Sequence, residues 1–225
     1  MGSIARAGPL SSATFSGYLL DVPSSRSLAD PAMALIEAKS VTVRSGSAVI
    51  RAATPEDAEQ LELLNQAIDR ETEFLMRSPG EFTLTLDEHR QFIAKTRDSK
   101  RNLLLVAELN GSMVGLLLFT GSHLARFQHQ GDFAIAVLRD SWGQGLGRAL
   151  VSMLLQWDDE VGILRVGLRV AVNNSRAIDL YKSMGFDAEG ILRAERMHLD
   201  GPQDTLVMAR VRVRDPLPEP GDQRR

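Results

Sequence analysis

The sequence predicts an α/β fold of the α+β type, in which a mixed, mostly antiparallel central sheet is flanked by helices. Three observations lead to this class. Two capped helical segments follow each other early in the chain, and an apolar hairpin comes next. A further apolar strand then runs through a glycine-rich turn into an amphipathic helix. The expected order of elements is β-α-α-β-β-β-α-β-α-β-β.

The first two helices are predicted from their N-terminal signals. A short strand at 48–51 precedes Thr54, which can cap a helix, and Pro55, which suits the first helical position. Apolar residues then recur at helical spacing as far as about residue 68. Thr85 and Glu88 form a capping-box pattern that starts a second helix, ending near residue 96.

The hairpin is predicted from Asn110-Gly111, a dipeptide that favours tight two-residue turns between apolar strands. The later elements are predicted from apolar runs that end at turn residues, including Gly185 at a helix end. The predicted strands are 103–109, 113–120, 133–138, 164–172, 190–194 and 205–213, and the predicted helices are 145–157 and 174–184.

Composition and segment character indicate one folded domain with tails. Residues 1–46 are rich in Ser, Ala and Gly and are expected to be a mostly unpacked N-terminal tail, either disordered or loosely docked. Residues 47–213 are expected to form the domain, and the proline-rich 214–225 a C-terminal tail. The net charge of −3 argues against nucleic-acid binding. Without long apolar stretches or a signal peptide, the expected location is cytoplasmic, with no membrane partner.

The residue types present also exclude several chemistries. The chain has no cysteine, which excludes disulfides, thiolate metal sites and cysteine nucleophiles. With only four histidines, a zinc site is not expected either, so we predict no metal.

The central feature is the glycine-rich turn at 140–150, which joins an apolar strand to a helix. Glycines adopt positive φ angles, and successive N–H groups at a helix start can bind an anion such as a pyrophosphate. The GxGxG spacing fits neither the P-loop, since no Gly-Lys-Ser/Thr follows, nor the dinucleotide pattern GxGxxG. The alternatives are a turn that only joins strand to helix, or a nucleotide-binding module.

Two motifs resemble those of the GNAT superfamily of N-acetyltransferases, in particular its bacterial members. The segment VLRDSWGQGLGRALV resembles the acetyl-CoA signature Arg/Gln-x-x-Gly-x-Gly/Ala, with Gly145 and Gly147 at its last two fixed positions. Trp142 stands where the family most often has Arg or Gln. The segment 174–186 resembles the later motif Asn-x-x-Ala-Ile-x-Leu-Tyr-x-x-x-Gly-Phe. The likeness covers residues 48–213.

This resemblance implies acetyl transfer from acetyl-CoA to an amine by direct attack in a ternary complex. It implies that Tyr181 is the general acid, that the Val137 N–H stabilises the oxyanion, and that backbone at 135–138 binds pantetheine. The other reading of Tyr181 is a core tyrosine, and that of Asn174 is a helix cap. The implied cofactor-binding residues are Val137, Leu138, Gly143, Gln144, Gly145, Leu146, Gly147, Arg148, Asn174 and Tyr181.

The general base is left open. Some family members have a Glu at the position of Arg169, which cannot accept a proton. The candidates are Asp132, Glu71 and Glu73, each of which can equally be a surface charge. The resemblance also implies that Glu71, Glu73 and Phe74 wall the acceptor site, where acids would suit a cationic amine.

The nature of the acceptor is left open as well. It can be a small-molecule amine or an amine of a protein, and a homodimer is compatible with the resemblance. The rival readings are an acyl-CoA-binding sensor or interaction domain of the same fold with little catalysis.

Overall fold

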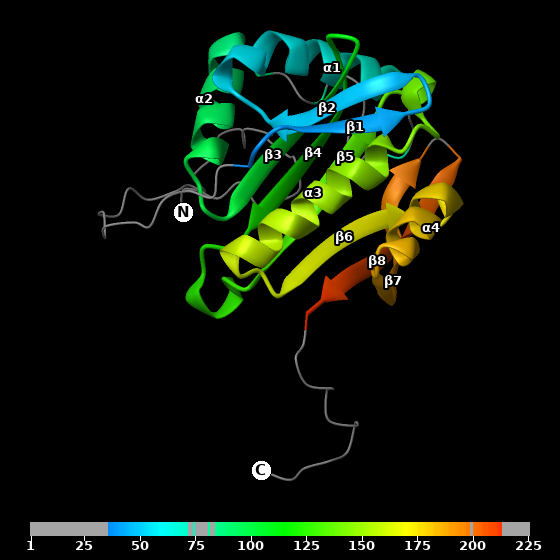
Figure 1. The fold of residues 1–225 in the computed structure, drawn as a ribbon. Helices are drawn as coiled ribbons and strands as arrows, with labels where there is room; N and C mark the ends of the chain where they lie inside the picture. Colours follow the sequence, from blue (N-terminus) through cyan, green and yellow to red (C-terminus); the bar gives the residue numbers. More distant parts are fainter. Residues whose placement is uncertain (1–35, 72–73, 75–80, 82–83, 199, 213–225) are drawn as a thin grey trace, which may run out of the picture.

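The computed structural model of the chain describes residues 36–71, 74, 81, 84–198 and 200–212. In this part, one eight-stranded sheet has the order β1-β2-β3-β4-β5-β6-β8-β7 (Figure 1). All neighbouring strands are antiparallel except β5 and β6, which are parallel. The strands are β1 Lys39–Val43, β2 Gly46–Ala52, β3 Asn102–Leu109, β4 Ser112–Gly121, β5 Gln130–Val137, β6 Arg165–Ala171, β7 Asp187–His198 and β8 Gly201–Val211.

Four α-helices flank the sheet: α1 Ala58–Glu71, α2 Leu86–Arg97, α3 Leu146–Val161 and α4 Ser175–Ser183. The mixed, mostly antiparallel sheet with flanking helices confirms the predicted fold class. From β2 onward the elements follow the predicted order. The predicted strand at 190–194 is longer than expected, because β7 extends over twelve residues at the edge of the sheet.

From Lys39 onward the structure shows a paired strand in place of the disordered or loosely docked tail expected over residues 1–46. Strand β1 pairs with β2 along its whole length, and Val43 is buried. Polar and apolar residues alternate from Ser40 to Val43, as in a half-covered edge strand, but so short a pattern in a serine-containing segment gives a weak signal. Residues 1–35 and the predicted C-terminal tail 214–225 lie outside the described residues.

Local sequence signals act as predicted. Thr85 Oγ1 accepts a hydrogen bond from Glu88 N, and Glu88 Oε2 accepts one from Thr85 N at 2.7 Å, which completes the capping box of α2. In the hairpin between β3 and β4, Asn110 and Gly111 both have positive φ angles, 52° and 78°. Two positive values identify a turn whose twist matches that of the strands.

Two apolar clusters lie on opposite faces of the sheet. Helices α3 and α4 pack on one face through residues such as Leu150, Leu154 and Tyr181. Helices α1 and α2 pack on the other through Leu64, Ile93 and their neighbours. Helices α3 and α4 approach each other closely, because a Cβ at Gly147 would lie 3.3 Å from Leu180 Cδ2. Helices α3 and α4 therefore cover one face of the sheet, and α1 and α2 cover the other.

A buried acid near the end of α3 makes stability depend on pH. Asp158 is buried, and among the described residues its Oδ1 has no hydrogen-bond partner. Burial raises the pKa of Asp158 to about 6, while Arg212 and Arg210 oppose this rise. Because the folded pKa lies above the unfolded one, the protonated acid favours the folded state. Its stabilising contribution is full below about pH 4 and is lost as the pH rises through about 6.

We therefore expect Asp158→Asn to raise the melting temperature at pH 8, where the native carboxylate is charged, and to change it little at pH 4. Thermal unfolding between pH 4 and 8 measures the difference. Asp159→Asn is the matched control, because this neighbouring acid is exposed and paired with Arg212. A melting-temperature difference for Asp158→Asn that does not vary with pH would contradict the assignment.

Candidate functional site

Strands β5 and β6 separate part of the way along the sheet. They pair only over Gln130–Asp132 and Arg165–Gly167. Beyond that point β5 stays paired with β4 as far as Val137, and β6 stays paired with β8 as far as Ala171. We call residues 133–137 of β5 and 168–171 of β6 the fork. Their facing backbone edges do not pair with each other, so this part of the sheet can accept an extended ligand between the strands.

The backbone of β5 presents hydrogen-bond donors to the fork. Leu138 N donates to Val114 O at 2.9 Å, and Val137 is opposite Gly115. Successive N–H groups of a strand point in opposite directions. The N–H groups of Val137 and Ile135 therefore point away from β4 and toward β6. The predicted oxyanion donor, Val137, has the required orientation, and Ile135 shares it.

Trp142 lies at the end of β5 and contacts residues on three segments. Its Nε1 donates to Val137 O at 2.6 Å. The Cζ atoms of Arg139 and Arg176 lie 5.5 and 5.3 Å from the centroid of its ring, within the range of cation–π interactions. The sequence shows this residue only as a departure from the family signature. Its position between a strand end and two arginines depends on the fold.

The glycine turn has the backbone that the sequence predicts. Gly143 has a φ of 74° and Gly145 a φ of 94°, both in the left-handed region. Gly145 is the N-cap of α3, no side chain caps this end, and a Cβ at Gly145 would meet no atom within 4 Å. The first N–H groups of α3 thus start without intrahelical partners, beside open space.

The side chains of the turn have partners of their own. Gln144 Oε1 accepts from Ser45 Oγ, and Arg148 Nη2 donates to Ser183 Oγ at 2.7 Å. Arg176 Nη2 lies 3.2 Å from the Cβ position of Gly143, so its guanidinium group lies directly beside the turn. Arg176 stands at a variable position of the later motif and was not among the predicted site residues.

A groove of about 400 Å³ lies between β1, β2 and α3 and includes Gly145 and Arg148 in its lining. This volume is within the usual range for small-molecule sites. The groove exists because β1 extends the sheet past α3, which the sequence did not predict. The remaining lining residues are Lys39, Val41, Thr42, Val43, Ile50, Ala149, Ser152, Met153 and Gln156.

Tyr181 lies at the start of the fork, on the side covered by α3 and α4. It is buried, and its ring packs edge-on against Phe133 at 5.8 Å and Phe186 at 6.0 Å between centroids. Burial raises the pKa of the Tyr181 phenol above its ordinary value of 10. The raised pKa keeps the phenol protonated at neutral pH. Because the hydroxyl makes no hydrogen bond to another described residue, its proton is available to a ligand.

Asn174 caps α4, as the simpler interpretation of this residue predicts. Its Oδ1 accepts from Ala177 N at 3.2 Å. This bond starts the helix that carries Tyr181, whether or not the amide also contacts a ligand.

The structure separates the three candidate bases. Asp132 is exposed and occupies the last paired position before the fork. Glu71 Oε2 accepts from Arg139 N at 2.8 Å, and its carbonyl accepts from the Arg139 side chain, so Glu71 connects the end of α1 to the start of the glycine turn. Glu73 lies outside the described residues. The carbonyl of Phe74, a predicted wall residue, accepts from Arg196 at 3.2 Å.

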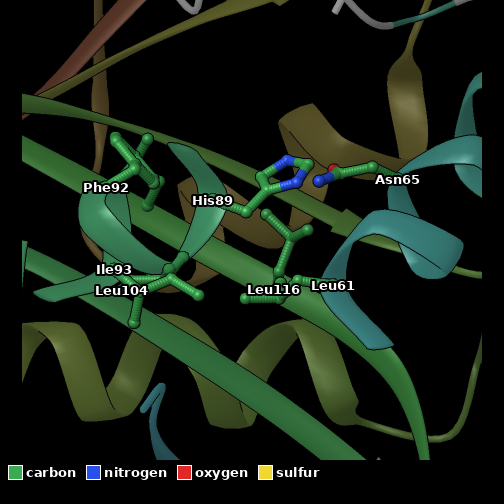
Figure 2. Close-up of a pocket in the computed structure, with 8 residues that line it drawn as sticks. Leu61, Asn65, His89, Phe92, Ile93, Leu104 and Leu116 are labelled. Atoms are coloured by element: carbon green, nitrogen blue, oxygen red, sulfur yellow. The ribbon is translucent and has the colours of Figure 1, made fainter. Parts of the chain in front are cut away.

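A second, much smaller cavity lies between α1, α2 and the sheet. Its volume of about 30 Å³ is that of roughly one water molecule. Figure 2 shows the ring of buried His89, from α2, directed toward Asn65 of α1, with leucine side chains around them. The cavity is far too small for a coenzyme and lies on the face opposite α3.

The described residues contain no group of three or more His, Asp or Glu side chains placed to hold a metal ion. In the same part of the chain, no helix has the length and apolar character needed to cross a membrane.

Similarity to a family model, to curated proteins and to solved structures identifies acetyltransferases as relatives of this chain. Residues 66–186, more than half of the chain, match the model of the Acetyltransferase (GNAT) family. The chain is 40% identical over 77 residues to the ribosomal protein bS18-alanine N-acetyltransferase of Escherichia coli K12, covering 34% of this chain and 52% of that protein. It is 32% identical over 109 residues to the L-amino acid N-acetyltransferase AaaT of the same organism, covering 48% and 67%. The chain thus spans about half the length of the first of these curated relatives.

Solved structures match over most of the domain. A GNAT-family acetyltransferase from Streptococcus pneumoniae superposes with a TM-score of 0.70 at 31% identity, covering 73% of this chain and 98% of that one. A putative acetyltransferase from Salmonella typhimurium, solved with its cofactor acetyl-CoA, superposes with a TM-score of 0.67 at 20% identity, covering 76% and 98%. The second likeness concerns the fold alone.

Proposed function

Because this chain belongs to the GNAT acetyltransferase family, we propose that it transfers an acetyl group from acetyl-CoA to a primary amine. The observation that carries the proposal is the fork between β5 and β6, which lies between the glycine turn and Tyr181. In this proposal the pyrophosphate binds at the glycine turn, the thioester arm lies in the fork, and the proton donor is Tyr181 at the other end of the fork.

The donor is proposed to bind from the glycine turn into the fork. The free N–H groups at the start of α3 and the helix dipole suit the pyrophosphate, and Arg176 adds a positive charge beside Gly143. The pantetheine arm then pairs with the free edge of β5. Trp142 already donates to the Val137 carbonyl, so the amide groups of the arm use other polar atoms of this edge.

The acceptor is proposed to approach from the face that carries α1 and α2. On the other face, Phe133 and Tyr181 are buried in the core under α3 and α4. On the α1 and α2 face, Asp132 and Ala134 of β5 are exposed. The neutral amine attacks the thioester carbonyl carbon and the carbonyl oxygen becomes negative. The intermediate then collapses, breaking the carbon–sulfur bond, and Tyr181 gives its proton to the leaving thiolate. The nitrogen releases its extra proton as the amide forms, and a proton from solvent restores the Tyr181 phenol.

The positions along β5 favour Ile135 over Val137 as the oxyanion donor. Tyr181 packs on Phe133, which is two residues from Ile135 and four from Val137, or roughly 7 and 14 Å along a strand. The carbonyl oxygen must lie close to the sulfur that Tyr181 protonates. We therefore assign the oxyanion to the Ile135 N–H and a pantetheine contact to the Val137 N–H.

Position along β5 also distinguishes the two described candidate bases, Asp132 and Glu71. Asp132 is adjacent to Phe133, whereas Glu71 binds Arg139 at the far end of β5. An acceptor ammonium group must lose a proton before it attacks. Asp132 is the better placed of the two carboxylates to receive it, directly or through water.

Proline substitutions test the two backbone donors, because proline removes an N–H and leaves the carbonyl. We expect Ile135→Pro to lower kcat about 100-fold, the usual effect of losing an oxyanion donor, with little change in the Kd of acetyl-CoA. Val137→Pro should instead raise that Kd. Steady-state kinetics and calorimetry measure the two effects.

Ala136→Pro is the matched control, because it removes an N–H that points toward β4 and so should destabilise the sheet. If Ile135→Pro retains full kcat while folded, the oxyanion assignment is wrong.

A further inference from the structure

The strand that lines the other side of the fork carries an arginine on the acceptor face. Val166, Leu168 and Val170 of β6 belong to the core under α3 and α4. Side chains of a strand alternate between its faces, so Arg165 and Arg169 lie on the face of α1 and α2. Pairing with β5 ends at Gly167, which places Arg169 within the fork and Arg165 before it.

Arg169 is paired with a glutamate from the edge strand. Its Nη1 donates to Glu195 Oε1 at 2.6 Å, and the side chains are 43% and 20% exposed. A guanidinium group has five N–H donors in a plane, and it binds carboxylates through two of them at once. Glu195 lies on β7, on the side of β6 away from β5, and its bond fixes one edge of the group, so the remaining donors form an exposed and oriented surface on the face of α1 and α2.

Glu195 is presented by an irregular segment that is itself held in place. The register of β7 with β8 shifts between Leu192 and Arg196, so residues 193–195 bulge from the strand. Within the bulge, Ala194 has a φ of 52°, a conformation that is unfavourable for alanine. Asp204 fixes it, since Oδ1 accepts from Ala194 N at 2.8 Å and Oδ2 pairs with Arg193 Nε at 2.8 Å.

Arg196, directly after the bulge, also contacts Phe74. Arg196 Nη1 donates to the Phe74 carbonyl at 3.2 Å. Arg169 is thus linked to Glu195 in the bulge, and Arg196, directly after the bulge, is linked to Phe74. Strained backbone that a specific side chain holds in place is common at binding sites.

We propose that Arg169 binds a carboxylate of the acceptor and that Glu195 positions it, so that the preferred acceptor is an α-amino acid. This inference rests on the proposed acetyl transfer. In an α-amino acid the carboxylate and the amine share one carbon, which suits a carboxylate-binding group carried by the strand that borders the fork.

The test compares each amino acid with its amide, which keeps the amine and lacks the carboxylate charge. We expect kcat/KM to be about 10- to 100-fold higher for the acid, the range of a charge-assisted hydrogen-bonded pair. Arg169→Gln should reduce the acid-to-amide ratio to about one by slowing the acid only. Glu195→Gln should lower the same ratio less, because the guanidinium group remains but loses its fixed orientation.

Arg165→Gln is the matched control. Arg165 lies on the same strand and face and pairs with Glu189 of β7, but where β5 and β6 are still paired. It should leave the ratio unchanged. Amides acetylated as fast as acids, or a ratio that survives Arg169→Gln, would overturn the inference while leaving acetyl transfer intact. If the native chain does not bind acetyl-CoA, the proposed function itself is refuted.

Discussion

Replacing Gly145 by glutamate is expected to abolish acetyl-CoA binding, with at least a 100-fold rise in Kd. Gly145 is the N-cap of α3 and borders the groove along that helix, and a Cβ there would meet no protein atom within 4 Å. The new carboxylate would occupy the space proposed for the pyrophosphate and would repel it. Isothermal calorimetry with acetyl-CoA measures the change.

The helix supplies its own control at its other end. Gly162, the C-cap of α3, also has a positive φ, 77°, and also has open space around its Cβ position. Gly162→Glu should therefore match the backbone strain of Gly145→Glu, on the order of 1 kcal/mol in the free energy of unfolding. It should bind acetyl-CoA normally. Equal loss of binding in both variants would mean that strain, not the donor site, explains the effect.

Tyr181→Phe is expected to lower kcat by about 100- to 1,000-fold, within the range for losing a general acid, while the Kd of acetyl-CoA changes less than about twofold. The phenylalanine ring keeps the edge-on packing against Phe133 and Phe186, so the fold should be retained. Pre-steady-state thiol release and a binding titration on the same preparation separate the two quantities.

The pH profile gives a second test of this role. Burial raises the pKa of Tyr181, so the hydroxyl stays protonated above pH 10. The native enzyme should therefore show no loss of kcat from this group between pH 7 and about 10. If Tyr181→Phe retained the native kcat, the residue would be only part of the core.

Features that depend on neighbours in the chain could be predicted from the sequence. The capping box at Thr85, the turn at Asn110-Gly111 and the positive φ angles of Gly143 and Gly145 each follow from a few consecutive residues. The two motifs placed Tyr181 on a helix whose cap is Asn174. These local signals set the order of elements and the region of the site.

Features that depend on contacts between distant segments could not be predicted. The pairing of Arg169 with Glu195, 26 positions away, requires β6, β8 and β7 in that order and a bulge at Ala194. The bond between Glu71 and Arg139 spans 68 positions and gives Glu71 a structural contact that its charge alone does not indicate. Strand β1 was missed because its pattern is short and lies in a serine-rich region.

The most direct test of acetyl transfer is amine-dependent release of coenzyme A thiol, with mass spectrometry of the product. The chain is incubated with acetyl-CoA and a library of amino acids, their amides, simple amines and short peptides. We predict thiol release that requires an amine, an equal amount of N-acetylated product, and loss of both in Gly145→Glu. Tight acetyl-CoA binding without amine-dependent release anywhere in the library would contradict the account and identify a domain that binds acetyl-CoA without transferring its acetyl group.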